Sequence, residues 1–193
     1  MAAKLILSST SQYRRELLER LRFPFTCASP NIDESAHVDE TPKQLVSRLA
    51  LAKAKVVSGR ERDAVVIGSD QVAFLNNRII GKPGNKLAAI QQLQACSART
   101  IQFFTGLAVC CASTGFNSVH VEVFTVHFRP LTKSTIENYL ELEKPYDCAG
   151  SFKCEGLGIA LFSKMEGDDP TSLQGLPLIA LTSMLAAAGI SII

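Results

Sequence analysis

Residues 4–22 read KLILSSTSQYRRELLERLR, a stretch that passes from an apolar run through a polar turn into a segment with helical spacing. The apolar residues 5–7 predict a short buried strand at residues 4–7. Ser11 is placed to cap the helix that follows, which we expect to run to about residue 22. One face of that helix carries Leu17, Leu18 and Leu21. A strand followed directly by an amphipathic helix indicates an α/β fold.

The alternation of strand-like and helix-like segments continues through the first half of the chain. Residues 25–28 predict a second strand. Thr41 followed by Pro42 is a cap and a first-turn proline, and it predicts a helix whose apolar positions repeat at helical spacing as far as Val56. Apolar residues at 64–68 and 72–75 predict a strand that is interrupted by polar residues between them.

The second half of the chain is richer in strand-like sequence. Asn76 and Asn77 suit a tight turn, and a helix is expected around residues 87–96. Two long β-rich runs at residues 100–112 and 118–128 predict an antiparallel hairpin. Three further elements are expected: a helix at 132–143, a strand-like segment at 159–162 and a helix at 177–188. Since no linker divides the chain, we expect one α/β domain over residues 1–193, with two lobes and a cleft between them.

Composition excludes several classes of protein. The 193 residues are 47% hydrophobic and 20% charged, which is not the composition of a disordered chain. Twenty Lys and Arg against 18 Asp and Glu leave a net charge of +2, so nucleic acid is a poor candidate partner. The sequence contains no run of about 18 apolar residues, so no membrane span is expected. The N-terminus lacks the apolar core of a signal peptide. We therefore expect a cytoplasmic protein with neither nucleic acid nor membrane as a partner.

Cysteine and histidine give no metal or nucleophile motif. The six cysteines contain no C-x-x-C pair, and we expect most of them to be buried, reduced thiols. The three histidines form no close ligand pair, and His120 and His127 lie in a strand-like run where a structural role is expected.

The polar residues 8–15 hold the first candidate site. A helix N-terminus presents unpaired N–H groups, and Arg14 and Arg15 beside it are able to bind phosphate oxygens. The alternative is an ordinary serine-capped helix with two solvated arginines, and the segment alone favours that alternative. The glycine-rich phosphate loops are absent from the sequence.

Acidic and basic residues supply the other candidates. Asp70 follows a buried strand, where open α/β sheets place their ligand sites, and its carboxylate needs a partner or a chemical role. Asp33 and Glu34 form an acidic pair, which alone is typical of a solvated loop. Lys53 lies on an apolar helix and Lys82 stands between a glycine and a proline, and together with Asp70 they suggest a phosphate and metal site.

These motifs resemble the Maf family of nucleoside triphosphate pyrophosphatases. The resemblance runs along nearly the whole chain through LILSSTSQYRRELLERL, the Asp33 and Glu34 pair, LAKAK, IGSDQV, GKP, AGSFKCEGLGI and GLPLIAL. Within the family the chain is most similar to the subgroup that acts on 7-methyl-GTP, because Tyr13, Gln71 and Glu155 stand at its specificity positions. The dTTP/UTP subgroup has Arg, Thr and Gln there. One departure is Tyr13, where Trp is typical of the subgroup.

The resemblance implies a fold and a reaction. It implies a twisted mixed β-sheet flanked by helices, a deep central cleft, a homodimer, and a divalent metal cation, Mg²⁺, Mn²⁺ or Co²⁺. It further implies cleavage between the α- and β-phosphates, with Asp70 as proton acceptor and metal ligand. The residues that correspond to the family's phosphate and metal positions are Ser9, Arg14, Glu34, Lys53 and Lys82.

The chemistry of the substrate agrees with these positions. Cationic side chains and a metal neutralise a triphosphate, while Asp70 holds or deprotonates the attacking water. Methylation at N7 makes guanine cationic, which favours the aromatic face of Tyr13 and the negative charge of Glu155. In the alternative, Tyr13 merely packs and Glu155 pairs with Lys153. Two other functions stay open: a dTTP/UTP pyrophosphatase of the same family, and a nucleotide-binding regulator of cell division.

Overall fold

The computed structural model describes residues 4–193, which hold seven strands and five α-helices of a mixed α/β fold. The strands are β1 (Leu5–Ser8), β2 (Thr26–Cys27), β3 (Val65–Leu75), β4 (Arg78–Ile80), β5 (Thr100–Cys111), β6 (Phe116–Phe128) and β7 (Phe162–Glu166). The α-helices are α1 (Gln12–Glu19), α2 (Pro42–Arg60), α3 (Lys86–Cys96), α4 (Lys133–Glu143) and α5 (Leu178–Ala187). Three 3-10 helices, η1 (Ala149–Ser151), η2 (Leu157–Leu161) and η3 (Pro170–Gln174), complete the elements. The α/β prediction is confirmed.

The chain divides into two compact units. The first contains the described residues up to Gln71 together with Thr105–Glu122 and Asp169–Ile193. The second contains Val72–Phe104 and Val123–Asp168. The prediction of a cleft and that of a single domain stay predictions.

Parallel strands form the centre of the first unit, where the strand order is β2-β1-β3-β5-β6. β1 pairs in parallel with β3, with Leu5 opposite Val65 and Ser8 opposite Gly68. Immediately after β1, the Ser11 side chain accepts a hydrogen bond from the Arg14 backbone N–H and begins α1 as the sequence predicts.

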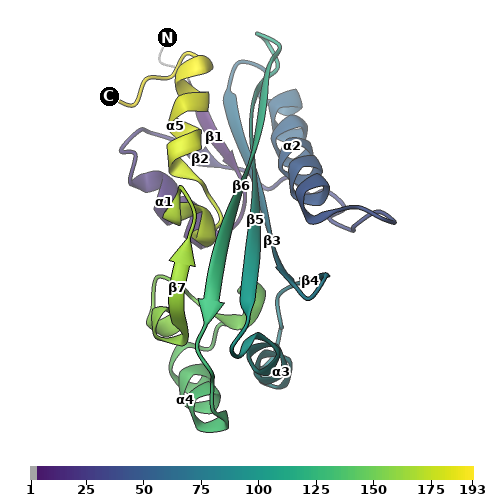
Figure 1. Ribbon diagram of the computed structural model, residues 1–193. Coiled ribbons are helices and arrows are strands. Elements are labelled where there is room, and N and C mark those ends of the chain that lie inside the picture. The colour runs from purple at the N-terminus through teal and green to yellow at the C-terminus, as the bar shows by residue number, and fades with distance from the viewer. Residues whose placement is uncertain (1–3) are drawn as a thin grey trace. The chain divides into compact units, whose positions relative to one another are not determined.

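Helices cover both faces of the strands in the first unit (Figure 1). Val65 and Ile67 point to a core shared with α1 and α5, whereas Val66 points to a core shared with α2. This alternation follows from the two-residue period of a strand. Neighbouring residues of β3 therefore present their side chains to different helices.

Two glycines allow α2 to pack directly against the strands. A Cβ at Gly68 on β3 would lie 2.2 Å from the Ala50 carbonyl oxygen, and one at Gly106 on β5 would lie 2.2 Å from that of Val46. The N-terminus of α2 is fixed by the predicted cap, since Thr41 and Gln44 form a capping box. The capping box therefore fixes where this helix begins, and the two glycines on neighbouring strands allow its close approach to the sheet.

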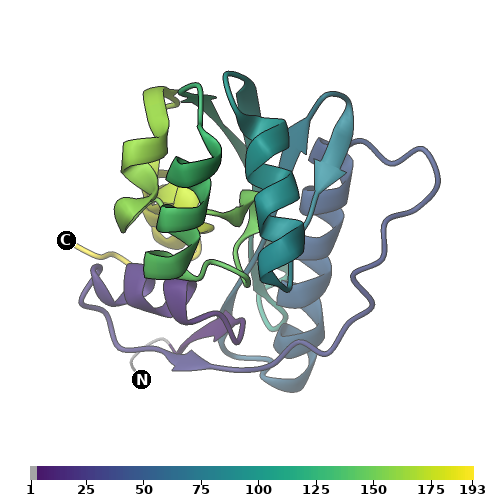
Figure 2. The same cartoon turned by 90° about the horizontal axis from the view of Figure 1, so that it is seen from below.

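The second unit contains the end of β3, the start of β5 and the end of β6. Its helices α3 and α4 pack side by side (Figure 2). The predicted Asn76–Asn77 turn joins β3 to β4, with φ of 50° and 63° at the two asparagines. The core of the second unit includes edge-to-face contacts among Phe103, Phe128, Phe152 and Phe162.

Two predicted elements differ from the structure. β3 runs without interruption through residues 69–71, because each polar side chain there has a polar partner inside the first unit. The segment predicted as a strand at residues 159–162 is mostly η2, and β7 begins only at Phe162. The cause is a tight turn in which the Gly158 N–H donates to the Lys153 carbonyl at 3.0 Å.

The cysteines and histidines follow the expectation in part. All six cysteines are free thiols; Cys96, Cys110 and Cys111 are buried, whereas Cys27 is exposed and the other two are half-buried. His127 lies between Thr100 and Glu166, and His120 contacts Glu122. Within residues 4–193 no helix is long and apolar enough to cross a membrane.

Candidate active site

A buried ion pair joins α2 to β3 in the first unit. The Lys53 ammonium lies 2.7 Å from Oδ1 of Asp70, and the two residues are 5% and 6% exposed. Ser8 at the end of β1 donates to the Lys53 backbone carbonyl at 2.6 Å and fixes this turn of the helix against the sheet. The close packing of α2 at Gly68 is what brings a lysine on the helix within reach of a carboxylate two residues further along β3.

A second carboxylate reaches the same lysine. Oε1 of Glu34 lies 2.9 Å from the Lys53 ammonium, and its side chain is largely exposed. Asp33, in contrast, accepts a hydrogen bond from the Ser35 backbone N–H at 2.9 Å, and this bond lowers the pKa of Asp33. Glu34 therefore belongs to the Lys53 cluster, and Asp33 serves the local turn.

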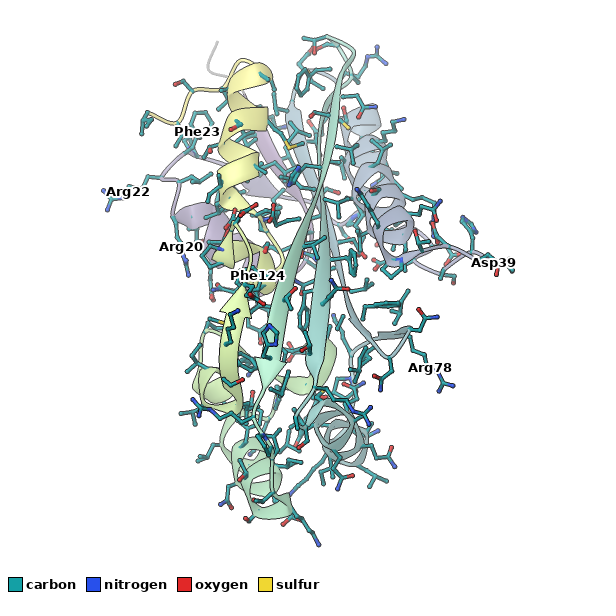
Figure 3. The ribbon with its side chains drawn as sticks, viewed as in Figure 1. Arg20, Arg22, Phe23, Asp39, Arg78 and Phe124 are labelled. Carbon is teal, nitrogen blue, oxygen red and sulfur yellow. The ribbon has the colours of Figure 1, made fainter. Side chains whose placement is uncertain are left out.

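The loop that carries Glu34 is tied back to α2. The Arg48 guanidinium binds both oxygens of Glu40, at 2.6 and 2.7 Å, and also donates to the Ser35 carbonyl. The hydrogen-bonded arginine lowers the pKa of Glu40 to about 2. Figure 3 labels Asp39, at the outer end of this loop. The two hydrogen bonds from Arg48 to Glu40 thus hold the loop to α2.

Arg14 lies in the first turn of α1, after the buried Ser9. The Ser9 hydroxyl accepts from the Ser11 backbone N–H at 3.1 Å, and Arg14 Nε donates to the Gly175 carbonyl at 2.9 Å. Burial lowers the pKa of Arg14, while the carboxylates of Asp70 and Glu34 act in the opposite direction. Across residues 4–193, its two terminal nitrogens have no hydrogen-bond partner, so they are available to an anion.

Three backbone carbonyls after β7, those of Ser172, Leu173 and Gly175, accept hydrogen bonds from side chains of the site. The Gly175 carbonyl accepts from Arg14 and from the Ser69 hydroxyl, and the Ser172 carbonyl accepts from the Gln71 amide at 2.7 Å. Asp169, only 2% exposed, fixes this segment by accepting from backbone N–H groups of η3 and α5. We call residues 172–175 the carbonyl segment.

Sequence reasoning missed this carbonyl segment. The sequence signal for it is the stretch DDPTSLQG at residues 168–175. An Asp followed by Pro is typical of a capped helical turn, and a Gly after the turn is typical of a left-handed C-terminal residue. Gly175 has φ of 96°, and a Cβ there would lie 3.2 Å from Arg14 Nε. Only a glycine fits both that backbone conformation and the arginine packed on it.

The predicted site residues are divided between the two units. The first unit brings Lys53, Asp70 and Glu34 into direct contact and holds Arg14 and Gln71 on the carbonyl segment. It also contains Ser9 and the half-buried Tyr13. The second unit contains the exposed Lys82 and Glu155.

The alternative role for Glu155 finds no support in the described contacts. The Lys153 ammonium donates to the Glu143 carbonyl at 3.0 Å, and none of the ion pairs within residues 4–193 joins Lys153 to Glu155. Glu155 instead accepts from the thiol of Cys154 at 3.4 Å.

A pocket of about 680 Å³ lies elsewhere on the first unit. It is lined by the 37–40 loop, the N-terminal half of α2 and Val119 of β6, and by none of the predicted site residues. The ion pair and the arginine carry reactive chemistry, whereas Glu40 and Arg48 at this pocket are paired with each other. We therefore place the candidate active site at Asp70.

Comparison with known proteins decides the family. The model of the family described as Maf-like protein matches residues 4–188, nearly the whole chain. The chain belongs to the Maf family.

Relatives of this Maf-family protein are similar over their full length. It is 55% identical over 188 residues to the 7-methyl-GTP pyrophosphatase of Pseudomonas savastanoi pv. phaseolicola, covering 97% of this chain and 98% of the relative. It is 53% identical to the proteins of the same name from Albidiferax ferrireducens, over 98% of this chain and 96% of the relative, and Pseudomonas aeruginosa, over 97% and 98%.

A solved structure shares the fold at much lower sequence identity. The HAM1 protein from Coxiella burnetii matches with a TM-score of 0.52 at 14% identity, covering 96% of this chain and 99% of that one. This likeness supports the fold assignment of the Maf-family chain.

Proposed function

We propose that this Maf-family protein hydrolyses 7-methyl-GTP to 7-methyl-GMP and pyrophosphate and so removes a modified nucleotide from the pool. The observation that carries the proposal is the 53–55% identity, over nearly the entire length, to relatives named 7-methyl-GTP pyrophosphatase. The geometry at Asp70 supports a hydrolytic reaction, because a carboxylate held beside cationic side chains is suited to activating water next to a phosphate.

Asp70 acts as the proton acceptor in this proposal. Its contact with Lys53 uses one carboxylate oxygen and fixes the side chain, which leaves Oδ2 to hold the attacking water. Arg14 is anchored through Nε, so its terminal nitrogens form the fork that grips phosphate oxygens. Ser9 and Lys82 are proposed as further phosphate contacts on the family resemblance.

The charge balance of the first unit supports a divalent cation in the reaction. Two carboxylates, Asp70 and Glu34, already neutralise Lys53 and balance the charge of Arg14. A triphosphate brought to this balanced site adds several negative charges that the four groups do not offset. A divalent metal held by these carboxylates would supply the missing positive charge and polarise the attacked phosphorus.

The donor set fits such a metal. Hard oxygen ligands suit Mg²⁺ and Mn²⁺, and Mg²⁺ is commonly held by one or two carboxylates plus substrate phosphates. Asp70 and Glu34 each place a carboxylate oxygen within 2.9 Å of the same Lys53 ammonium, and no group of three or more His, Cys, Asp or Glu residues in the described part of the chain forms a closed cage. We therefore propose Glu34 and Asp70 as metal ligands, completed by oxygens of the substrate.

Base recognition is proposed to fall to Tyr13, Gln71 and Glu155. A cationic 7-methylguanine favours an aromatic face and a carboxylate over neutral guanine. Glu155 is exposed and carries no ion pair in the described residues, which leaves its charge available to a ligand.

The setting of the reaction is also a proposal. We propose that the protein acts in the cytoplasm as a homodimer, and the six free thiols support a reducing compartment. Light scattering coupled to size-exclusion chromatography measures the mass in solution, and a mass of one chain would overturn the dimer.

The test is pyrophosphate release by the purified protein with Mg²⁺ or Mn²⁺ across 7-methyl-GTP, GTP, dTTP, UTP, CTP and ATP. We expect the fastest pyrophosphate release from 7-methyl-GTP, and we expect a chelator to abolish this release. Turnover of dTTP or UTP in its place would keep the reaction and overturn the substrate. Nucleotide binding without turnover would instead support the regulator of cell division.

A further inference from the structure

The side-chain amide of Gln71 is held in one orientation. Its Nε2 atom lies 2.7 Å from the Ser172 carbonyl and 3.2 Å from the Leu173 carbonyl, both in the carbonyl segment. Backbone carbonyls only accept hydrogen bonds, so the end of the amide that faces them must be the donating NH₂ group. A flipped amide would place oxygen against two oxygens and leave buried groups unpaired.

Thr105 completes this arrangement from β5. Its hydroxyl donates to the Ser172 carbonyl at 2.9 Å, and the same oxygen lies 3.0 Å from Gln71 Nε2. A threonine hydroxyl has one proton, and here that proton goes to the carbonyl, so Oγ1 accepts from Gln71. Thr105 is 1% exposed, so water does not compete for its hydroxyl.

All the side-chain hydrogen bonds of Gln71 to the described residues use its nitrogen. Within residues 4–193 the amide oxygen has no protein donor, and the side chain is only partly buried. Gln71 therefore presents to its surroundings an oxygen that accepts and no group that donates.

We propose that Thr105 is a positioning residue that holds Gln71 as an acceptor-only contact for an N–H donor on the base of the nucleotide. This inference rests on the proposed function and adds the polarity of one contact to it. The Watson–Crick edge of guanine offers two such donors, N1–H and the exocyclic amine. Thr105 acts through Gln71 and does not touch the nucleotide itself.

The test compares Thr105→Val, which removes the hydroxyl at nearly constant volume, with Thr105→Ser, which keeps it. Calorimetric titration measures the affinity of each variant for 7-methyl-GMP, which the proposed reaction does not consume, and for pyrophosphate, which has no base. We expect Thr105→Val to weaken 7-methyl-GMP binding about five-fold, the value of one ordinary hydrogen bond, with pyrophosphate binding unchanged. Thr105→Ser is expected to bind both ligands as the unaltered protein does.

Three results would overturn the inference. They are equal binding of 7-methyl-GMP by Thr105→Val and the unaltered protein, equal weakening of both ligands, and equal weakening by both substitutions. The last two would mean that Thr105 serves packing alone. Failure of the proposed function is separate, because it would appear as absent turnover of 7-methyl-GTP by the unaltered protein, whatever the pattern of product binding.

Discussion

Replacing Lys53 by methionine tests the buried ion pair on which the site is built. The change keeps an unbranched side chain one atom shorter in α2 but leaves the Asp70 carboxylate, 6% exposed, without its cation. Removing one member of a buried pair costs about 3 to 5 kcal/mol, because the remaining charge stays desolvated and uncompensated. Glu34 loses the same partner, but its side chain is exposed and adds little.

Asp70→Asn is expected to cost less than Lys53→Met. The asparagine oxygen still accepts a hydrogen bond from the Lys53 ammonium, and that ammonium keeps Glu34 at 2.9 Å. We therefore expect a loss of about 1 to 2 kcal/mol, the range for a weakened hydrogen bond to a charged group. The unequal effect of the two substitutions follows from the three-residue arrangement and not from the pair alone.

Urea denaturation followed by far-ultraviolet circular dichroism at pH 7 measures these free energies of unfolding. Lys55→Met is the matched control, because Lys55 is an exposed lysine of the same helix and should change stability by no more than about 0.5 kcal/mol. A free energy for Lys53→Met equal to that of Lys55→Met would refute the reasoning. So would a larger loss for Asp70→Asn than for Lys53→Met.

Three further outcomes are expected. Gly68→Ala places a Cβ against the backbone of α2 and should destabilise the fold by about 1 to 3 kcal/mol, whereas Gly59→Ala, with open space at its Cβ, should not; equal urea midpoints would contradict this. Because Arg48 lowers the pKa of Glu40 to about 2, the stability lost in Glu40→Gln should be full at pH 7, shrink below about pH 4.5 and vanish near pH 2 in urea titrations. Burial raises the pKa of the Cys96 thiol to about 12, so native protein at pH 8 should resist alkylation there by iodoacetamide, and labelling seen by peptide mass spectrometry would argue against it.

Local signals in the sequence were sufficient to predict much of the fold. Ser11 and Thr41 cap their helices through the expected side-chain contacts, and the Asn76–Asn77 turn adopts the left-handed conformation that asparagine tolerates. Each of these features depends on residues within a few positions of one another. These caps and this turn can therefore be predicted without knowledge of distant contacts.

The uninterrupted course of β3 could not be predicted in the same way. Ser69 is hydrogen-bonded to a carbonyl 106 residues further along the chain, and Gln71 to one 101 residues away. Hydrophobic periodicity treats these polar residues as a break, whereas partners that only folding brings near make them compatible with a buried strand.

The candidate site was predicted in its residues but not in its contacts. The motifs pointed to Asp70, Lys53 and Glu34 separately, and the approach of α2 over Gly68 is what joins them. Spacing left the choice between Asp33 and Glu34 open, and the structure assigns Glu34 to the cluster. The carbonyl segment was not predicted, because it contributes backbone carbonyl oxygens, and every residue type has such an oxygen.

The most direct test of the account is the rate of pyrophosphate release from 7-methyl-GTP by the unaltered protein, Asp70→Asn and Asp63→Asn. Asp63 is the matched control, an exposed carboxylate of the same unit outside the site. If Asp70 is the proton acceptor, its replacement should lower kcat/KM at least about 100-fold in a folded protein, while Asp63→Asn leaves it unchanged. Full activity of folded Asp70→Asn would contradict the central claim.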